Sequence, residues 1–513
     1  MVYSATFEVL DRSAAGRATQ QALIISGESI NYRELADRSI SVAYGLRRVG
    51  IQPGDRVAVL MGDSIEWVVA FYAIGRVGGV VVPINPRSKL DELEYFLGQS
   101  GATTLIVDEF PHCSPKDITA VADRLGIERS SIIVFNANGY SSDATFWSFL
   151  AEGSVVDLPV VLPSDVALIQ YTSGSTSKPK GAVLRHSSIT GDALNIARRM
   201  KLNGGERIFS GLPFFHVGGT VLHLMLNHTI GGTAVSLRKF TGADAVAAVE
   251  RYRCVMFSGV EPHFLLTIES EGFSAERVAT VTKALSTGTP AILRRIAERM
   301  NIDGLVAMYG LSETSSNITM CAVDDPEEWR LETCGYPHPG SEVAVVDPQT
   351  LVPLENSVIG EVLVRGYNLM VGYHGSVAGE PSPFTPDGWL RTGDLGSIDS
   401  YGLLRFEGRS KDVLRVGGEN VSATEVEEVI AVAPGVAQVA VIGKSHPTLG
   451  EVPVAFVTLV DEVDGAAFTR QLLTFIEARL ASFKVPREIH ILATMPSTGS
   501  GKIHKPTLKG MTE

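Results

Sequence analysis

The stretch YTSGSTSKPKG, from Tyr171 to Gly181, combines small hydroxyl residues, glycine and lysine directly after the apolar run VALIQ. Glycine lets backbone N–H groups turn toward an anion, and the hydroxyl groups add further donors. Lys178 and Lys180 supply positive charge. This composition predicts a loop that wraps phosphate, although Ser177 stands where a loop of this kind is expected to carry glycine.

The order of residues separates this loop from the Walker-type phosphate loop, which reads G-x-x-x-x-G-K-[ST]. Here Lys180 precedes Gly181, and Ala182 follows. The C-terminal stretch TGSGKIHK also fails, because Pro496 holds the first glycine position and Ile503 the Ser/Thr position. The sequence therefore argues against a Walker-type NTPase.

Six further motifs carry residue types suited to joining two anions, a reaction that needs cations and N–H donors. They are LPFFHVGG with His216, STGTP at 286–290, MYGLSET at 308–314, RTGDLG at 391–396, GRSKDVLRVGGENVSATEVE at 408–427 and PSTGSGKIHK at 496–505. In this order they resemble the motifs of the adenylate-forming superfamily, which contains acyl-CoA synthetases, adenylation domains of peptide synthetases and beetle luciferases. The resemblance, strongest for the acyl-CoA ligase branch, covers essentially the whole chain.

The resemblance implies a ligase that works in two steps. A carboxylate is first joined to AMP from ATP with release of pyrophosphate, and a thiol then displaces AMP. The implied substrates and cofactors are a carboxylic acid, ATP with AMP as product, Mg²⁺ and coenzyme A.

The resemblance also implies which residues bind the nucleotide and its metal. Tyr309 would stack on adenine, Ser312 would contact the α-phosphate, and Asp394 would accept hydrogen bonds from the ribose hydroxyls. Thr176 and Glu313 would hold Mg²⁺, for which a carboxylate is the expected hard ligand. The full implied nucleotide set is Thr172, Ser173, Gly174, Ser175, Thr176, Ser177, Lys180, Gly288, Thr289, Pro290, Met308, Tyr309, Gly310, Ser312, Asp394 and Arg409.

Lys502, Glu313 and His216 form the implied catalytic set. Lys502 would reach the acid carboxylate and the α-phosphate oxygens and neutralise charge as the two anions approach. A point charge on a flexible stem suits that task. His216 matches a residue that gates the acyl carboxylate, so we expect it to bind substrate and not to act as a general base.

The expected acid pocket is mainly apolar. No Asp stands where an amino-acid-activating domain would anchor an α-ammonium group, and Gly218 with Gly219 suggests space for bulk. We therefore expect an aromatic, alicyclic or fatty acid. The expected lining is Phe215, His216, Gly218, Gly219, Thr287 and Met308.

The C-terminal part is expected to move during the cycle. The resemblance implies that a small domain presents Lys502 for adenylation and then rotates about Lys411 to present another face for thiol transfer. The face expected to line the coenzyme A tunnel consists of Arg415, Gly417, Gly418, Glu419 and Asn420.

Three points stay open in the sequence. No carrier domain follows the motifs, which favours coenzyme A as acceptor, but a stand-alone enzyme that loads a carrier protein is an alternative. A homodimer is also left open. If Ser177 has positive φ, its side chain costs roughly 1–2 kcal/mol and would hinder ATP binding most, so an enzyme competent only in thioesterification of a supplied acyl-adenylate is the second alternative.

Length and composition bound these expectations. A chain of 513 residues is too long for one ordinary core. Its formal charge of −13 argues against a general nucleic-acid binder. Its four cysteines are far apart, which argues against a disulfide framework or zinc site. No signal-peptide pattern and no apolar run of about 18 residues is present, so we expect a cytoplasmic protein without a membrane span.

The elements that must position these motifs change character along the chain. The first half alternates strand and helix patterns, which favours parallel sheets with flanking helices. After about residue 335, short strands and turns predict a small β-barrel layer, and the last 100 residues or so have an α+β pattern of their own. We therefore expect an α/β fold with a large N-terminal domain, 1–408, and a small mobile C-terminal domain, 409–513.

Overall fold

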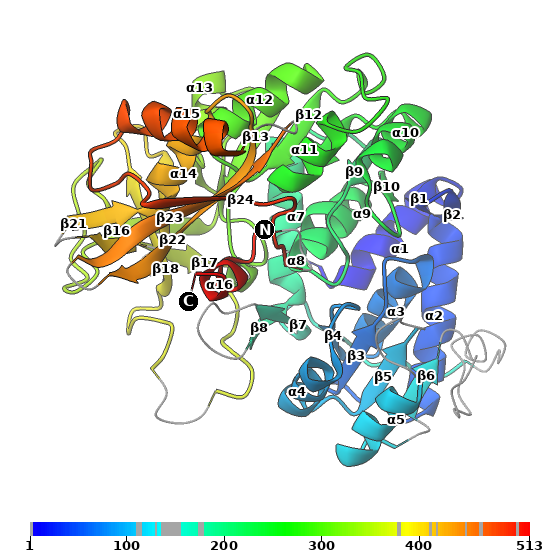
Figure 1. The fold of residues 1–513 in the computed structure, drawn as a ribbon. Helices are drawn as coiled ribbons and strands as arrows, with labels where there is room; N and C mark the ends of the chain where they lie inside the picture. The colour runs from blue at the N-terminus through cyan, green and yellow to red at the C-terminus, as the bar shows by residue number, and fades with distance from the viewer. Residues whose placement is uncertain are drawn as a thin grey trace.

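The computed structural model of this chain describes eleven stretches of residues. They are 4–108, 115–128, 131–134, 155–172, 179–376, 381–409, 413–416, 419–446, 449–460, 465–498 and 502–512. The described elements form two sheet-based layers, a smaller antiparallel sheet and a C-terminal α+β unit (Figure 1). This is the α/β architecture with a large N-terminal and a small C-terminal domain that the sequence predicts.

One sheet carries at its edge the two strands that flank the predicted phosphate loop.

 Within the described residues it has six strands in the order β6-β5-β3-β4-β7-β8, all parallel except that β8 runs antiparallel to β7. The strands are β3 (Arg56–Leu60), β4 (Val80–Pro83), β5 (Thr104–Val107), β6 (Ile132–Val134), β7 (Val166–Thr172) and β8 (Lys180–Arg185). Thr172 pairs with Lys180 across β7 and β8, so the two ends of the predicted phosphate loop are held side by side.

The second sheet has nine strands within the described residues, in the order β15-β14-β13-β12-β11-β9-β10-β1-β2. Its central strands are parallel, and the outer strands β2, β14 and β15 are antiparallel. The strands are β1 (Gln21–Ile25), β2 (Glu28–Asn31), β9 (Arg207–Ser210), β10 (Thr233–Ser236), β11 (Met256–Ser258), β12 (Lys283–Ser286), β13 (Gly304–Tyr309), β14 (Thr319–Met320) and β15 (Tyr336–Pro337).

Helices connect and cover these two sheets (Figure 1). Helix α3 is buried along its whole length, which explains why its sequence, IEWVVAFYAIGR, is apolar on every face. The N-terminal helices are α1 (Thr6–Arg17), α2 (Tyr32–Arg48), α3 (Ile65–Arg76), α4 (Leu90–Ser100), α5 (Pro115–Arg124), α7 (His186–Arg199), α8 (Val217–Gly219), η2 (Thr220–Met225), α9 (Leu226–Ile230), α10 (Gly242–Tyr252), α11 (Glu261–Ile268), α12 (Pro290–Met300), η3 (Ser312–Thr314) and α13 (Glu327–Glu332).

Local signals in the sequence set where two of these helices begin. Asn31 accepts a hydrogen bond from the Glu34 N–H at 2.9 Å, and the Glu34 carboxylate accepts from the Asn31 N–H at 3.3 Å. This reciprocal capping box starts α2. Ser64 accepts from the Trp67 N–H at 3.1 Å and starts α3 in the same way, with one bond.

The predicted β layer is an antiparallel sheet that joins the two domains. Its order is β16-β17-β18-β19, with β16 (Ser341–Val346), β17 (Gly360–Gly366), β18 (Leu390–Ile398) and β19 (Leu404–Arg409). Asp394 on β18 pairs directly with Arg409 on β19. The predicted domain boundary after residue 408 thus falls at the end of β19.

The C-terminal unit has its own sheet and core. The strands β20 (Val413–Val416), β21 (Glu419–Ser422), β22 (Val436–His446), β23 (Gly450–Leu459) and β24 (Glu488–Ile491) form the sheet, and the helices are α14 (Ala423–Ala431), α15 (Gly465–Glu477) and α16 (Lys505–Gly510). The unit contacts the N-terminal domain through α14, which packs against β19 and α12. Ser422 also donates to the Glu407 carbonyl at 2.9 Å across this joint.

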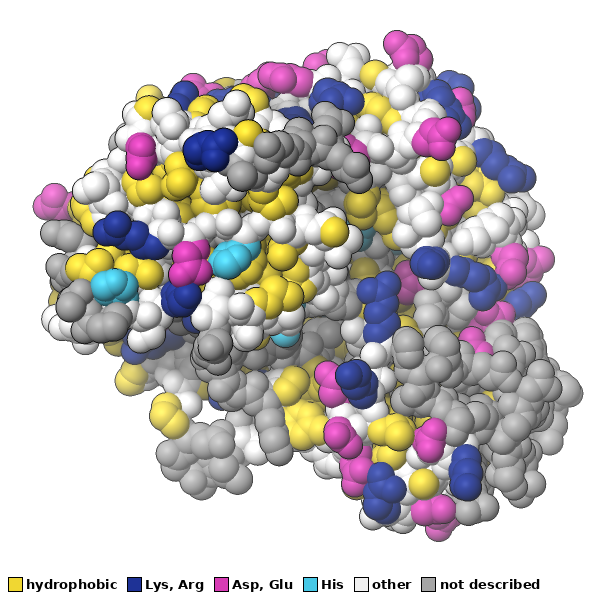
Figure 2. Space-filling view, in the orientation of Figure 1, with side chains coloured by type: hydrophobic (Ala, Val, Ile, Leu, Met, Phe, Trp, Pro, Cys, Tyr) yellow, Lys and Arg dark blue, Asp and Glu magenta, His cyan; other side chains and the backbone are white. Residues whose placement is uncertain are grey.

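The surface mixes charges of both signs. On the face shown in Figure 2, described Lys and Arg side chains are interspersed with Asp and Glu. Of the helices described, none has both the length and the apolar composition needed to cross a membrane.

Candidate active site

The predicted motifs converge at the end of the nine-stranded sheet. Residues that follow β12 and β13 lie at the carboxyl ends of parallel strands, where ligands of α/β proteins commonly bind. The segment 287–290 follows β12 and leads into α12, whereas Gly310–Ser312 follows β13. Strands β18 and β19 bring the RTGDLG motif to the same place, as contacts between side chains show below.

Asp394 is the centre of a buried polar group. Its Oδ2 accepts a hydrogen bond from the Tyr309 hydroxyl at 2.8 Å, and its Oδ1 lies 3.1 Å from Nε of Arg409. The Thr392 Oγ1 accepts from the Asp394 N–H at 3.1 Å and fixes the backbone there. Asp394 thus contacts two other residues predicted to bind the nucleotide, Tyr309 and Arg409, and the first of them lies 85 positions away in the sequence.

The ring of Tyr309 is largely covered in this arrangement. It is 6% exposed, and its centroid lies 6.0 Å from that of Phe406. Stacking of adenine on Tyr309 requires one covered face to open. Binding of ribose hydroxyls to Asp394 likewise requires that they share or replace its present partners, Tyr309 and Arg409. Both roles stay predictions.

Glu313 belongs to a second polar group beside the phosphate-loop stem. The Tyr373 hydroxyl donates to Glu313 Oε1 at 2.7 Å, and the Lys180 ammonium lies 5.2 Å from the centre of the Tyr373 ring. The Met370 N–H also donates to the Glu313 carbonyl at 2.7 Å. The Glu313 carboxylate thus lies at the hydroxyl of Tyr373 and the Lys180 ammonium near its ring. A carboxylate suits Mg²⁺ and a cation suits the phosphates of a metal-bound polyphosphate.

Lys502 comes from the C-terminal domain and approaches both groups. Its backbone is tied to Thr498, whose N–H donates to the Lys502 carbonyl at 2.6 Å and whose Oγ1 accepts from the Lys502 N–H at 3.2 Å. Solvent reaches the Lys502 side chain, yet surrounding protein lowers its pKa by desolvation. The Arg409 charge lowers this pKa further, whereas Asp394 and Glu313 raise it. The lysine is therefore within electrostatic reach of the other predicted catalytic groups.

His216 is held in its neutral form. Burial lowers its pKa to about 3, and repulsion from Lys502 contributes. Its Nδ1 accepts a hydrogen bond from the Gly218 N–H at 3.1 Å and caps α8. An imidazole with this low pKa, already engaged in this bond, fits the expected substrate-binding role better than that of a general base.

The two glycines after His216 have different surroundings. A Cβ on Gly219 would lie 2.0 Å from the carbonyl oxygen of Pro213, whereas one on Gly218 would meet Leu212 and His216 at 3.3 Å or more. Gly219 therefore lacks a side chain because the backbone of Pro213 packs against it. That Gly218 and Gly219 leave space for a bulky acid stays a prediction.

The remaining described members of the predicted pocket lie near these groups in the fold. Met308 is buried at the end of β13, and Thr287 and Phe215 are half-buried. The Phe215 carbonyl accepts from Gln170 Nε2 at 3.2 Å, which ties the HVGG loop to β7. The acid-pocket assignment itself stays a prediction.

Some predicted residues lie outside the described part of the chain. These are Ser173, Gly174, Ser175, Thr176 and Ser177 of the phosphate loop, Lys411 of the hinge, and Gly417 and Gly418 of the coenzyme A tunnel. For Arg415, Glu419 and Asn420 the backbone is described, and Arg415 pairs with Asn420 in the β20–β21 hairpin.

Sequence reasoning missed a set of residues that hold the phosphate-loop stems. Gln99 on α4 accepts from the Tyr171 hydroxyl, and its Nε2 donates to the His374 carbonyl at 2.7 Å. The Tyr95 hydroxyl, also on α4, donates to the Pro179 carbonyl at 2.7 Å. No local motif marks these residues, because the contacts form only when α4 packs against β7 and β8.

ATP and Mg²⁺ fit the residues present. Thr289 Oγ1, at the start of α12, is buried and has no hydrogen-bond partner in the described part of the chain, so a polar ligand can satisfy it. The single carboxylate of Glu313 suffices for Mg²⁺, which commonly uses one or two carboxylates plus substrate phosphates. Lys502, Arg409 and Lys180 supply the positive charge that a polyphosphate needs.

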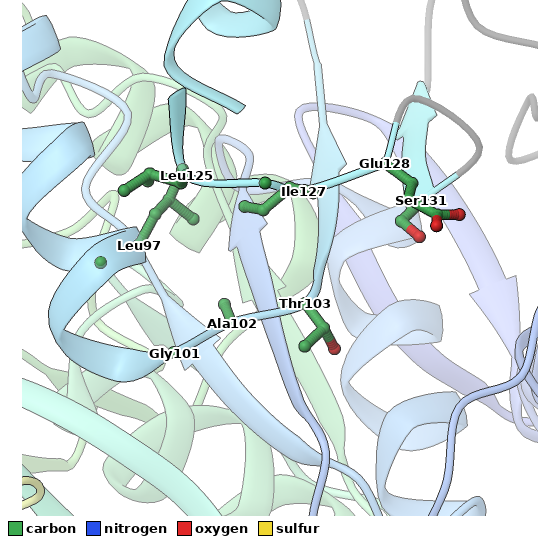
Figure 3. A pocket seen from close by; sticks show the side chains of 10 residues that line it. Leu97, Gly101, Ala102, Thr103, Leu125, Ile127, Glu128 and Ser131 are labelled. Carbon is green, nitrogen blue, oxygen red and sulfur yellow. The ribbon is translucent and has the colours of Figure 1, made fainter. Parts of the chain in front are cut away.

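An open hollow of about 440 Å³ lies away from these motifs (Figure 3). It is lined by residues of the 97–103 and 125–131 segments, around α4, β5 and the end of α5. Among the described residues of its lining, Glu128 is the one charged side chain. The chemistry is therefore concentrated at the carboxyl ends of β12 and β13 and not in this hollow.

Two family models match consecutive parts of the chain. The model of the AMP-binding enzymes matches residues 10–374, and that of the C-terminal domain of AMP-binding enzymes matches residues 425–502. A Mycobacterium tuberculosis CoA ligase for a methyl-dioxo-octahydroindenyl-propanoyl group is 31% identical, covering 98% of this chain and 97% of that protein. Feruloyl-CoA synthase of an Amycolatopsis species is 32% identical, covering 93% of each.

Solved structures are similar to this chain over nearly its whole length. MatB from Rhodopseudomonas palustris with ATP bound has a TM-score of 0.88 to this chain, with 27% identity and 99% of both chains covered. The apo structure of the same protein has a TM-score of 0.78 over the same share of both chains. By TM-score the structure is thus more similar to the ATP-bound protein than to the apo protein.

Proposed function

Because the chain belongs to the AMP-binding enzyme family and is an AMP-forming acid–thiol ligase, we propose that it joins a hydrophobic carboxylic acid to coenzyme A through a bound acyl-adenylate. The acid is aromatic, alicyclic or fatty. One observation carries the proposal: Lys502 of the small domain lies within electrostatic reach of Asp394 and Glu313 of the large domain and of Arg409 at the domain boundary.

In the first half-reaction, a carboxylate oxygen of the acid attacks the α-phosphorus of ATP. The bond to the β-phosphate oxygen breaks, and pyrophosphate leaves with its electron pair. Lys502 reduces the repulsion between the two anions as they approach, and Glu313 would hold Mg²⁺, which would neutralise phosphate charge. Asp394 and Arg409 orient the AMP part.

In the second half-reaction, the sulfur of coenzyme A attacks the acyl carbon. The bond from that carbon to the AMP oxygen breaks, AMP leaves, and the thiol proton passes to solvent. We infer that the C-terminal domain rotates about Lys411 between the two steps, so that Lys502 serves only the first. The similarity to a ligase for a bicyclic propanoate and to feruloyl-CoA synthase supports a hydrophobic acid.

A panel of acids tests this proposal through exchange of labelled pyrophosphate into ATP. We expect exchange with at least one aromatic, alicyclic or fatty acid, and acyl-CoA formation when coenzyme A is added. Exchange with no acid, together with conversion of a supplied acyl-adenylate to acyl-CoA, would favour the thioesterification-only enzyme that Ser177 suggests. Recovery of exchange in Ser177→Gly would then identify that serine as the cause.

The lowered pKa of Lys502 predicts how adenylation depends on pH. A cationic group with a lowered pKa loses its charge at a lower pH, so kcat/KM for exchange should fall on the alkaline side before an ordinary lysine deprotonates. The fall should be absent from thioesterification of a supplied acyl-adenylate. The Lys502→Arg variant stays charged, so its residual exchange activity should not fall at alkaline pH in this way. If the fall persists in Lys502→Arg, another group causes the pH dependence.

A further inference from the structure

The turn that carries Ser312 and Glu313 is tight and strained. It leaves the sheet at Tyr309 and returns at once, since the Ile318 N–H donates to the Tyr309 carbonyl at 2.9 Å. Ser315 and Ser316 have φ values of 60° and 110°, which residues with side chains rarely adopt. Such a conformation persists only where the surrounding structure holds it.

Asn368 holds one side of this turn. Its Nδ2 donates to the carbonyls of Asn317 at 2.7 Å and Thr314 at 3.3 Å, and its own carbonyl accepts from the Ser315 hydroxyl at 2.9 Å. Ser341 fixes the amide by donating to its Oδ1 at 2.9 Å. These bonds hold the Thr314 and Asn317 carbonyls of the turn. The Asn317 N–H has a different partner.

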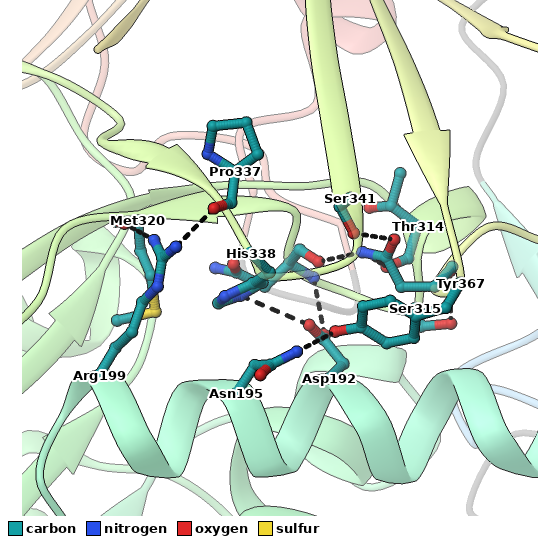
Figure 4. Close-up of polar contacts among 12 residues, drawn as sticks. Asp192, Asn195, Arg199, Thr314, Ser315, Met320, Pro337, His338, Ser341 and Tyr367 are labelled. Carbon is teal, nitrogen blue, oxygen red and sulfur yellow. Dashed lines mark hydrogen bonds and ion pairs between the residues drawn. The ribbon is translucent and has the colours of Figure 1, made fainter. Parts of the chain in front are cut away.

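Asp192 on α7 is that partner for the returning strand. Its Oδ2 accepts from the Asn317 N–H at 3.0 Å, and the side chain is wholly buried. Asn195 and Arg199 follow at helical spacing on the same face (Figure 4). Arg199 donates to the carbonyls of Met320, Tyr336 and Pro337. Helix α7 therefore also binds the backbone of β14 and β15, which follow the turn.

Asp192 acts as a hydrogen-bond acceptor toward the turn. Burial raises its pKa well above the ordinary value. The facing His338, whose Nε2 lies 3.6 Å from Asp192 Oδ1, has a pKa lowered to about 3 by burial, with Arg199 contributing. His338 is therefore uncharged near neutral pH. The Asn317 N–H needs only a side-chain oxygen in the right position.

We propose that Asp192 is a positioning residue for adenylation, which holds the returning backbone of the 310–318 turn and thereby places Glu313 and Ser312. Glu313 and Asp192 do not touch, so the effect passes through the backbone. The proposal rests on the proposed role of Glu313 as a metal ligand. It concerns the first half-reaction alone, in which Glu313 would hold Mg²⁺ against the phosphates of ATP.

Asp192→Leu and Asp192→Asn test the proposal together. Leucine fills the site but leaves the Asn317 N–H without an acceptor, whereas asparagine keeps an oxygen there. We expect Asp192→Leu to lower kcat/KM for pyrophosphate exchange roughly ten- to a hundredfold, as misplacement of a catalytic group does, and to raise the Mg²⁺ concentration needed. Asp192→Asn should stay near wild type, and thioesterification of a supplied acyl-adenylate should change little in both.

Ile189→Ala is the matched control, because Ile189 is buried on the same helix and makes no polar contact with the turn. Hydrogen exchange of the Asn317 amide should accelerate in Asp192→Leu and not in Ile189→Ala. Equal losses of exchange activity in these two variants, or a change confined to KM for the acid, would overturn the proposal. Glu313→Gln tests the proposed role of Glu313 separately from that of Asp192. If Glu313→Gln loses exchange activity and Asp192→Leu does not, only the inference about Asp192 is overturned. If Glu313→Gln keeps full activity, the proposed role of Glu313 is overturned.

Discussion

Replacing Lys502 by alanine is expected to lower pyrophosphate exchange roughly 10²- to 10³-fold, the range seen when one preorganised donor to a developing charge is removed. Lys502 lies within electrostatic reach of Arg409, Asp394 and Glu313, and it belongs to the C-terminal domain. Without the positive charge of Lys502, the repulsion between the acid carboxylate and the α-phosphate is less well compensated as they approach. The measurement is acid-dependent exchange at saturating ATP and Mg²⁺.

The same variant should convert a supplied acyl-adenylate to acyl-CoA at close to the wild-type rate. This split follows if the C-terminal domain rotates and removes Lys502 before the thiol attacks. Lys509 provides the control, because it is an exposed lysine on α16 of the same domain; Lys509→Ala should retain both half-reactions. Equal loss of both half-reactions in Lys502→Ala would contradict the role proposed for this lysine.

Replacing Asp394 by alanine is expected to impair both half-reactions, because the AMP part is bound in each. Hydrogen bonds to a charged group contribute about 1.5–3 kcal/mol each, so two bonds from ribose hydroxyls correspond to roughly 10²-fold or more. The measurements are kcat/KM for exchange and the rate of thioesterification at limiting acyl-adenylate.

The Asp394 variant also removes a structural contact, which needs its own control. The Tyr309 hydroxyl and the Arg409 guanidinium both lose their partner, so thermal unfolding of the variant should be compared with that of Tyr309→Phe. The phenylalanine variant loses one bond to Asp394 but keeps the carboxylate for the ribose. If Tyr309→Phe lost as much activity as Asp394→Ala, the loss would come from the structural contact and not from the ribose.

Much of the fold follows from local patterns. The capping box of Asn31 and Glu34 and the Ser64 cap act within four residues of the helix start, so the sequence shows them directly. The β–α alternation likewise needs only the period of apolar residues. The close packing behind Gly219 is different, because the Pro213 carbonyl reaches it only through the path of the folded backbone.

The candidate site divides in the same way. The types and order of the motif residues, from the phosphate loop to Lys502, are properties of the sequence and are sufficient to predict an adenylate-forming ligase. The groups that position them are not: Tyr373 meets Glu313 across 60 positions, Asp192 meets Asn317 across 125, and Gln99 meets His374 across 275.

The sequence by itself thus determined the reaction class, because the chemistry needs particular side chains in short motifs. Such motifs can be recognised before the fold is known. Only the tertiary structure decided which residues hold those runs in place. The physical reason is that a hydrogen bond to a backbone group carries no local signature: a buried carboxylate, amide or phenol can serve, and its partner is fixed only when distant elements pack together.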